Sequence, residues 1–323
     1  MVNDQVLSIT RAPFLHHFAL ENWQIDWNKG ENRMVEWKDR LVHLDHCRGM
    51  TWKGMYRILK DDPELLKVYT RPVNYWENLL SLEPPALQFF LKDLHDLKLQ
   101  QMTSIYEQDT ICCISFLDKE YPITLTNIYQ QPWILYAKGN VQLLTHQRIL
   151  AIIGTRAPTH YGNEVLKRLV PEFVAAEMSI VSGLAKGIDA MAHRITLQSG
   201  GDCIAVIGGG LYHIYPRENT RLSHMILQKG LILSEYPPIF KPKPWHFPMR
   251  NRLISGLSRA ILVVESKQKS GTFITVERGL EQGKDIFAVP GNIFSETSSG
   301  TNAWIKEGAK LVTDANDIIS EWE

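Results

Sequence analysis

The stretch Ile204-Ala205-Val206-Ile207-Gly208-Gly209-Gly210 decides the fold of this 323-residue chain. An apolar run rich in β-branched residues leads into three glycines, which let the backbone approach a ligand and adopt φ angles that other residues resist. Parallel α/β sheets present backbone N–H groups to phosphate at such strand-to-loop transitions. Residues 150–153 followed by Gly154 repeat the pattern, and Arg156 and Arg217 lie close to the two loops. Together the loops predict an anion-binding site.

Short apolar strands alternate with helices from about residue 105 onward. The pattern predicts strands at 149–153, 179–182, 203–207, 231–234, 260–265 and 285–289, and helices at 162–177, 187–199, 218–229 and 271–282. This alternation is typical of parallel βαβ units with right-handed crossovers. We therefore expect an α/β fold with an extended Rossmann-like, doubly wound, mostly parallel sheet. Ligands of such sheets bind at the carboxyl ends of the strands, where every glycine-rich motif of this chain falls.

The chain divides into three parts. Residues 1–33 lack a sustained pattern and are expected to be an extension, either disordered or produced by a misassigned start codon. Residues 34–104 carry apolar side chains at helical spacing and predict a small all-helical domain. Residues 105–323 form the expected Rossmann-like domain.

Composition indicates an ordinary globular protein, with 44% hydrophobic and 22% charged residues. No apolar run approaches the roughly 20 residues of a membrane span, and no secretion signal is recognisable at the N-terminus. The cysteines Cys47, Cys112, Cys113 and Cys203 have no metal-ligand spacing, so reduced thiols and no bound metal are expected. We expect a cytoplasmic protein.

The net charge of zero hides an uneven distribution. Residues 151–260 hold about 13 Lys and Arg against about 7 Asp and Glu, whereas residues 261–323 hold about 6 against about 10. A basic middle and an acidic end suit an anion-binding face together with a separate partner surface. Scattered, solvated side chains are the alternative.

Several other polar and aromatic residues follow predicted strands. Ser182, Gly183 and Lys186 end one strand, and Phe247 adjoins Arg250 and Asn251. Guanidinium groups bind phosphate and aromatic rings stack on bases, so this composition is typical of nucleic-acid binding.

Three motifs bear on whether the chain has a catalytic site or binds a cofactor. Asp189 and His193 share a helix face, but no Ser or Cys in a nucleophile context accompanies them, so a capping carboxylate with a packed histidine is favoured over a catalytic pair. Glu265 ends a strand, where pairing with an arginine is favoured over acid–base chemistry. The dinucleotide and Walker glycine signatures are absent, so no cofactor is expected.

These blocks, in this order, resemble the DprA/Smf family of DNA-processing proteins. The resemblance covers about residues 105–313 and rests on Gly154-Thr155-Arg156, Ser182-Gly183-Leu184-Ala185-Lys186-Gly187-Ile188-Asp189, Gly208-Gly209-Gly210-Leu211 with Tyr215-Pro216, Ser234-Glu235-Tyr236-Pro237, Phe247-Pro248 with Arg250-Asn251-Arg252, Ser270-Gly271, and Ala288-Val289-Pro290-Gly291. The preceding helical part looks like the sterile-alpha-motif-like domain of many members.

The resemblance implies a single-stranded-DNA-binding protein that is not an enzyme, needs no cofactor, protects incoming DNA in natural transformation and loads the RecA recombinase. By motif, Arg156 and Arg217 would be the principal phosphate ligands. The implied DNA contacts are Gly154, Arg156, Ser182, Gly183, Lys186, Gly208, Gly209, Gly210, Arg217, Asn219, Phe247, Arg250, Asn251, Ser270 and Gly271. The family also implies a homodimer, with Trp304, Ile305 and Leu311 expected at the seam.

The chain departs from the family pattern in places. Tyr212 stands where many members have Asp, and Arg217 where lysine is frequent. Because the sequence stops at Glu323, we expect no C-terminal winged helix of the kind some members carry.

Two other functions compete: a phosphoribohydrolase-like enzyme, whose catalytic glutamate is missing after Ser270-Gly271-Thr272, and a nucleotide- or sugar-sensing scaffold that binds no DNA.

Overall fold

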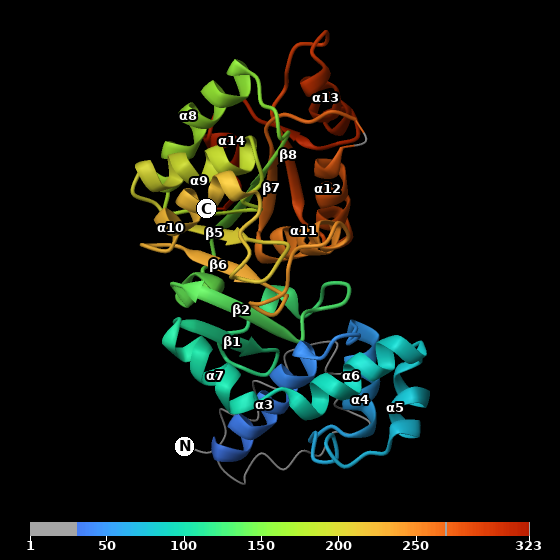
Figure 1. The fold of residues 1–323 in the computed structure, drawn as a ribbon. Coiled ribbons are helices and arrows are strands. Elements are labelled where there is room, and N and C mark those ends of the chain that lie inside the picture. Colours follow the sequence, from blue (N-terminus) through green and yellow to red (C-terminus); the bar gives the residue numbers. More distant parts are fainter. Residues whose placement is uncertain (1–30, 269, 323) are drawn as a thin grey trace. The chain divides into compact units, whose positions relative to one another are not determined.

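The computed structural model describes residues 31–268 and 270–322 (Figure 1). The described chain forms two compact units. One comprises the residues up to Lys119 together with Gln130–Leu135, and the other comprises Glu120–Tyr129 and Tyr136–Glu323. The sequence places the boundary between 104 and 105. The predicted extension falls outside the described residues up to position 30, and among the described residues the helix α3 begins at Glu31.

The first unit is helical, as predicted. Its described helices are α3 (Glu31–His46), α4 (Trp52–Asp61), α5 (Val73–Leu80), α6 (Pro84–Asp96) and α7 (Leu99–Gln108), followed by strand β1 (Ile111–Ser115). Thr51 caps α4 by accepting a hydrogen bond from the Gly54 amide at 3.0 Å. The apolar faces enclose a core that includes Leu41, Ile58 and Phe90.

The second unit is built on the sheet. Within the described residues the order of its strands is β2-β6-β5-β4-β3-β7-β8-β9. Neighbouring strands from β6 to β9 pair in parallel, and β2 pairs with β6 antiparallel. The strands are β2 (Ile134–Gly139), β3 (Ile149–Ile153), β4 (Ser179–Ser182), β5 (Cys203–Val206), β6 (Leu231–Ser234), β7 (Ala260–Val263), β8 (Asp285–Ala288) and β9 (Lys310–Leu311).

Helices cover both faces of this sheet, which makes it doubly wound as predicted (Figure 1). The α8, α9, α10 and α14 helices pack on one face around a core containing Leu166, Ile195 and Ile226, while α11, α12 and α13 lie toward the other. Their bounds are α8 (His160–Ala175), α9 (Ile188–Gln198), α10 (Thr220–Ile226), α11 (His246–Leu257), α12 (Gly271–Glu281), α13 (Ser299–Lys306) and α14 (Asn316–Ile319), and the short 3₁₀ turns are η2 (Ile123–Leu125), η3 (Val141–Thr145), η4 (Arg217–Asn219), η5 (Glu296–Ser298) and η6 (Ser320–Trp322).

The predicted strands are confirmed to within two residues, and all of their residues except Asp285 are buried, as expected for a sheet covered on both faces. The sequence missed α11, whose residues were treated only as a motif. The strand order reverses around β3, which lies between β4 and β7. Loops leaving adjacent strands on either side of such a point diverge and form a crevice.

Candidate nucleic-acid interface

The loops after β3, β4 and β5 meet at the carboxyl edge of the sheet. The Ile188 amide at the start of α9 donates to the Thr155 carbonyl at 3.1 Å. The Asn219 side-chain amide donates to the carbonyls of Leu184 and Ala185 at 2.9 and 3.1 Å. The loop of residues 183–187 therefore connects the Arg156 loop to the Arg217 turn.

Arg156 and Arg217 are both exposed. Neither guanidinium has a hydrogen-bond or salt-bridge partner among residues 31–268 and 270–322. The backbones of Gly187 and Arg156 pack closely together, since a Cβ added at Gly187 would lie 2.8 Å from the Arg156 Cα. Two guanidinium groups without a protein partner, on loops joined by hydrogen bonds, can each bind a phosphate of a polyanion.

Lys186 belongs to the same surface but is paired. Its Nζ lies 2.5 Å from a carboxylate oxygen of Glu218, and both side chains are more than half exposed. Exposed pairs of this kind contribute about 0–1 kcal/mol, so a phosphate can compete for the lysine.

Arg250 corrects the expectation of a direct phosphate contact. The residue is only 5% exposed, and its Nη1 donates to the Val206 carbonyl at 2.6 Å. Burial lowers the pKa of Arg250 to about 10, while Asp189 acts in the opposite direction. Arg250 therefore anchors the floor of the site and adds positive charge beneath it.

Gly183, Ser182 and Asn219 also face inward rather than toward a ligand. The Gly183 amide donates to Asp189 Oδ2 at 3.2 Å, and the Ser182 hydroxyl donates to the Ile152 carbonyl at 2.7 Å. Asn219 is 1% exposed, and its amide nitrogen bonds the 183–187 loop. The polar contacts predicted for these residues are satisfied inside the protein, so their roles are structural.

The triple glycine is a packing device. A Cβ would lie 2.9 Å from the Phe247 ring at Gly208, 2.9 Å from Pro242 at Gly209 and 2.1 Å from a carbonyl oxygen at Gly210. Glycine is needed there because a neighbouring chain segment approaches each of the three Cα atoms. The Gly210 amide donates to the Phe240 carbonyl at 2.8 Å, whereas the phosphate contacts expected of Gly208 and Gly209 stay a prediction; Gly154 is similarly crowded by Ile188.

Aromatic side chains border the arginines. The partly exposed Phe247 packs against Tyr215 with ring centroids 5.5 Å apart. Tyr215 is 54% exposed and Trp245 is 62% exposed. The sequence analysis quoted Tyr215 as part of the family motif but did not predict it as a site residue, although its position next to Arg217 was the available signal.

Asn251, Ser270 and Gly271 lie at the α11 and α12 helices. Asn251 Nδ2 reaches the Gly271 carbonyl at 3.5 Å, and the Ser270 hydroxyl lies 3.0 Å from that of Ser266. The structure thus brings Asn251 and Gly271 together, and both are accessible.

Glu265 contradicts the predicted pairing with an arginine. Its carboxylate accepts hydrogen bonds from the Thr159 amide at 2.8 Å and from the hydroxyls of Thr159 and Thr297 at 2.7 Å each. Thr159 caps α8, so this carboxylate occupies the N-terminal end of that helix, where Rossmann proteins often bind phosphate. A phosphate is excluded there by charge.

Asp189 and His193 are buried, 7% and 0% exposed. Burial lowers the pKa of His193 to about 3 and raises the pKa of Asp189. The Asp189 carboxylate bonds the Gly183 backbone, as described above, which agrees with the structural interpretation of this pair.

The family is established by the match of residues 112–323 to the family model described as DNA recombination-mediator protein A. The chain belongs to this family. It is 46% identical over 224 residues to the DNA processing protein DprA of Bacillus subtilis, covering 69% of this chain and 75% of the relative.

Two solved DprA structures share the fold. The X-ray structure of DprA from Streptococcus pneumoniae aligns with a TM-score of 0.76 at 36% identity, covering 88% of this chain and 98% of that one. A Helicobacter pylori DprA structure, titled for its single-stranded DNA binding mode, aligns with a TM-score of 0.59 at 30% identity and covers 66% of this chain and 95% of that one. The chain is therefore a DNA-processing protein of the DprA/Smf type.

The seam expected from the DprA resemblance is partly corrected. Trp304 is 6% exposed and packs on Phe273 with ring centroids 4.7 Å apart, so it belongs to the core. Ile305 is half-buried and Leu311 is 48% exposed. Only these two remain available for contact with a second copy.

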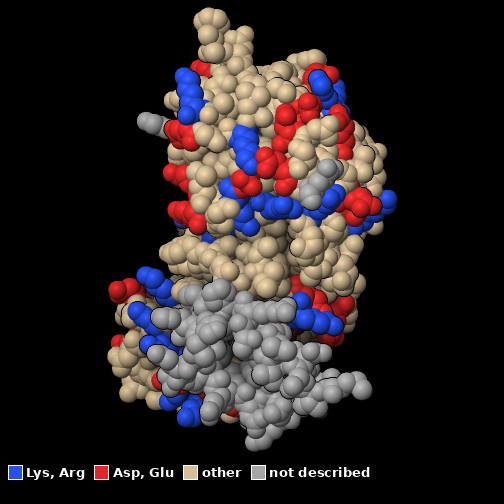
Figure 2. Space-filling model, turned by 180° about the vertical axis from the view of Figure 1, so that it is seen from behind, with Lys and Arg blue, Asp and Glu red and all other residues tan. Residues whose placement is uncertain are grey.

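The surface of the protein carries both positive and negative side chains. On the face shown in Figure 2, basic and acidic side chains lie side by side, in keeping with the zero net charge. Among the described residues, no cluster of His, Cys, Asp and Glu is arranged to hold a metal ion, and no helix is long and apolar enough to cross a membrane.

Proposed function

We propose that this protein binds single-stranded DNA at the carboxyl edge of the sheet. Arg156 and Arg217 hold phosphates, and bases lie toward Tyr215 and Phe247. The observation that carries the proposal is the pair of exposed, unpartnered guanidiniums on loops joined through residues 183–187. The DNA-binding title of the Helicobacter pylori relative supports it.

The arrangement favours a single strand over a duplex because bases must be free to stack on exposed rings. Such binders combine a cationic track with aromatic surfaces and have little sequence preference. No bond-making step is part of the proposal, since Asp189 and His193 are buried.

The test replaces Arg156 and Arg217 with alanine, singly and together. Each lost phosphate contact should lower the slope of log affinity against log salt by about 0.7. Arg168→Ala is the matched control, because Arg168 is exposed on the body of α8. Gel shifts with single- and double-stranded oligonucleotides across a salt series measure both affinity and slope. Unchanged binding by the double variant would refute the site.

We further propose that the bound strand is transferred to the RecA recombinase during natural transformation, and that the chain acts as a homodimer through Ile305 and Leu311. The family description as a recombination mediator supports the first point. RecA ATPase activity on single-stranded DNA should rise when the protein is added and should not rise with the double arginine variant. Sedimentation of Leu311→Arg tests the dimer.

A further inference from the structure

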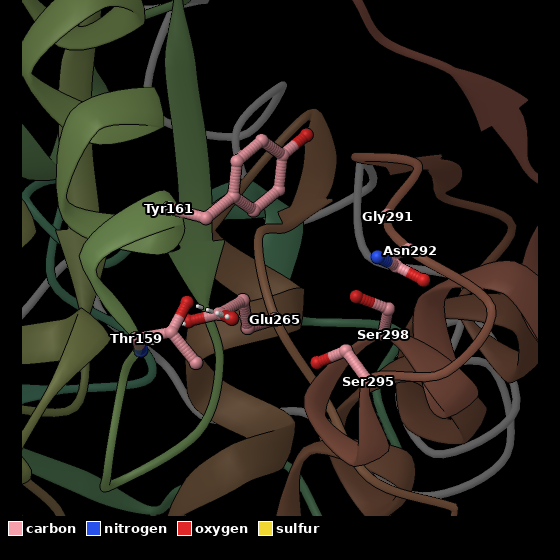
Figure 3. A pocket seen from close by; sticks show the side chains of 7 residues that line it. All are labelled: Thr159, Tyr161, Glu265, Gly291, Asn292, Ser295 and Ser298. Atoms are coloured by element: carbon pink, nitrogen blue, oxygen red, sulfur yellow. Dashed lines mark hydrogen bonds between the residues drawn. The ribbon is translucent and has the colours of Figure 1, made fainter.

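A pocket of about 320 Å³ lies at the point where the strand order reverses (Figure 3). Thr159 and Tyr161 form one wall, and Asn292, Ser295 and Ser298 extend from the facing segment after β8. Glu265 lies between the two walls, where the dashed line marks its bond to Thr159. The volume is at the small end of ligand pockets, roughly 300–1,000 Å³.

The lining favours a neutral hydrogen-bond donor over an anion. It contains a carboxylate, hydroxyls and an amide, and no Lys, Arg or His among the described residues. Glu265 is 2% exposed and already accepts three hydrogen bonds, so it acts on a ligand through its negative charge rather than through a free acceptor position. Phosphate is therefore disfavoured, whereas the amino group of a nucleobase matches these acceptors.

An exposed aromatic residue stands next to this pocket. Phe294 is 90% exposed and Ile293 is 83% exposed, the highest values among the large hydrophobic side chains of the described chain. The segment that carries them is tightly hydrogen-bonded: Asn302 bonds both the amide and the carbonyl of Gly291, at 3.1 and 3.0 Å, and Asn292 Oδ1 accepts from the Phe294 amide at 2.9 Å. These hydrogen bonds order the turn that carries the two exposed apolar side chains.

We propose that this pocket and Phe294 bind one nucleobase of the single strand, beyond the arginine site. The inference rests on the proposed function. Arg156 follows β3 and the Phe294 loop follows β8, with only β7 between them. Two strand spacings are about 10 Å, so a strand held at Arg156 can continue along the same edge. Tyr161, 45% exposed and anchored through its hydroxyl to the Pro290 carbonyl at 2.7 Å, lies on that path.

The occupant is a base rather than a second copy of the chain for two reasons. The pocket lining carries hydroxyl and amide groups beside its apolar surface, and such groups suit the polar edge of a base better than the apolar centre of a dimer interface does. Its aromatic border continues the series of exposed rings along the carboxyl edge, and base–aromatic stacking is the usual energy source of single-strand binders.

The experiment measures the affinity of the full chain for oligo(dC) and for the same oligonucleotide with one abasic position moved along it. Phe294→Ala should weaken binding roughly 5- to 100-fold, the equivalent of one stacked base. The slope of log affinity against log salt should stay unchanged, because no phosphate contact is lost. One abasic position should weaken binding by the unaltered protein and have no further effect on Phe294→Ala.

Ile123→Ala is the control, because Ile123 is 59% exposed in η2 and should leave affinity unchanged. Because cytosine carries an amino group and thymine does not, the pocket should add a small preference for oligo(dC) over oligo(dT), and Asn292→Ala should reduce that preference. If Phe294→Ala binds normally, or changes only the sedimentation of the protein, the inference is overturned and the arginine site stands. If the unaltered chain binds no single-stranded DNA, the proposed function fails as well.

Discussion

Gly187 positions Arg156, and its replacement by alanine tests how the interface is assembled. The residue has φ +76° and ψ −127°, a conformation that costs an alanine about 1–3 kcal/mol. The added Cβ would also lie 2.3 Å from the Thr155 carbonyl oxygen and 2.8 Å from the Arg156 Cα. Crowding of this kind costs roughly 1–3 kcal/mol more. We expect Gly187→Ala to lower the free energy of unfolding by about 2–6 kcal/mol.

Gly200→Ala provides the matched control. Gly200 has φ +79°, but a Cβ there would meet nothing within 4 Å. Its replacement should cost only the backbone strain, about 1–2 kcal/mol. Urea unfolding followed by tryptophan fluorescence compares the two variants, and the difference between them measures the contact with the Arg156 loop.

The same variant should weaken binding of single-stranded DNA. Displacing the Arg156 backbone removes part of one charged hydrogen bond, which is worth up to about 1.5–3 kcal/mol. Gly200→Ala should bind normally in the same gel-shift assay. The reasoning is refuted if the two variants lose equal stability and Gly187→Ala retains full affinity.

Two further predictions concern buried titratable groups. Glu235→Gln removes the carboxylate that pairs with the guanidinium of Arg252, a residue only 1% exposed. The variant should lower the free energy of unfolding, measured in urea, by about 3–5 kcal/mol, and a decrease below about 1 kcal/mol would contradict a buried ion pair. Burial lowers the pKa of His193 from 6.5 to about 3. Between these two pH values the unfolded chain binds a proton that the folded chain does not bind. The free energy of unfolding should therefore fall by up to about 1.4 kcal/mol per pH unit as the pH drops from 6.5 toward 3. His193→Gln should remove that part of the slope, and identical slopes for both proteins would count against it.

Local sequence was sufficient to predict most of the sheet. Strands such as 149–153 and 231–234 are continuous apolar runs, and only a two-sided core accommodates them. The helix α11 was missed because its sequence begins His246-Phe247-Pro248 and has no clean apolar period.

The sequence did not distinguish residues that face the anion site from residues that pack beneath it. Gly208, Gly209 and Gly210 have the composition of a phosphate loop, yet the structure fills the space above them with residues 237–247. Glu265 was assigned an arginine partner, but the contacting groups are threonines more than 30 residues away in sequence. Such partners are chosen by the packing of distant segments.

The sequence by itself determined that strands end in glycine-rich loops at one edge of a parallel sheet, because β-branched runs and glycines act locally on backbone conformation. Only the tertiary structure decided which arginines face solvent. Arg156 and Arg217 are exposed, whereas Arg250 and Arg252 are buried. The physical reason is that burial depends on which distant segments pack over a side chain, and no local pattern encodes that.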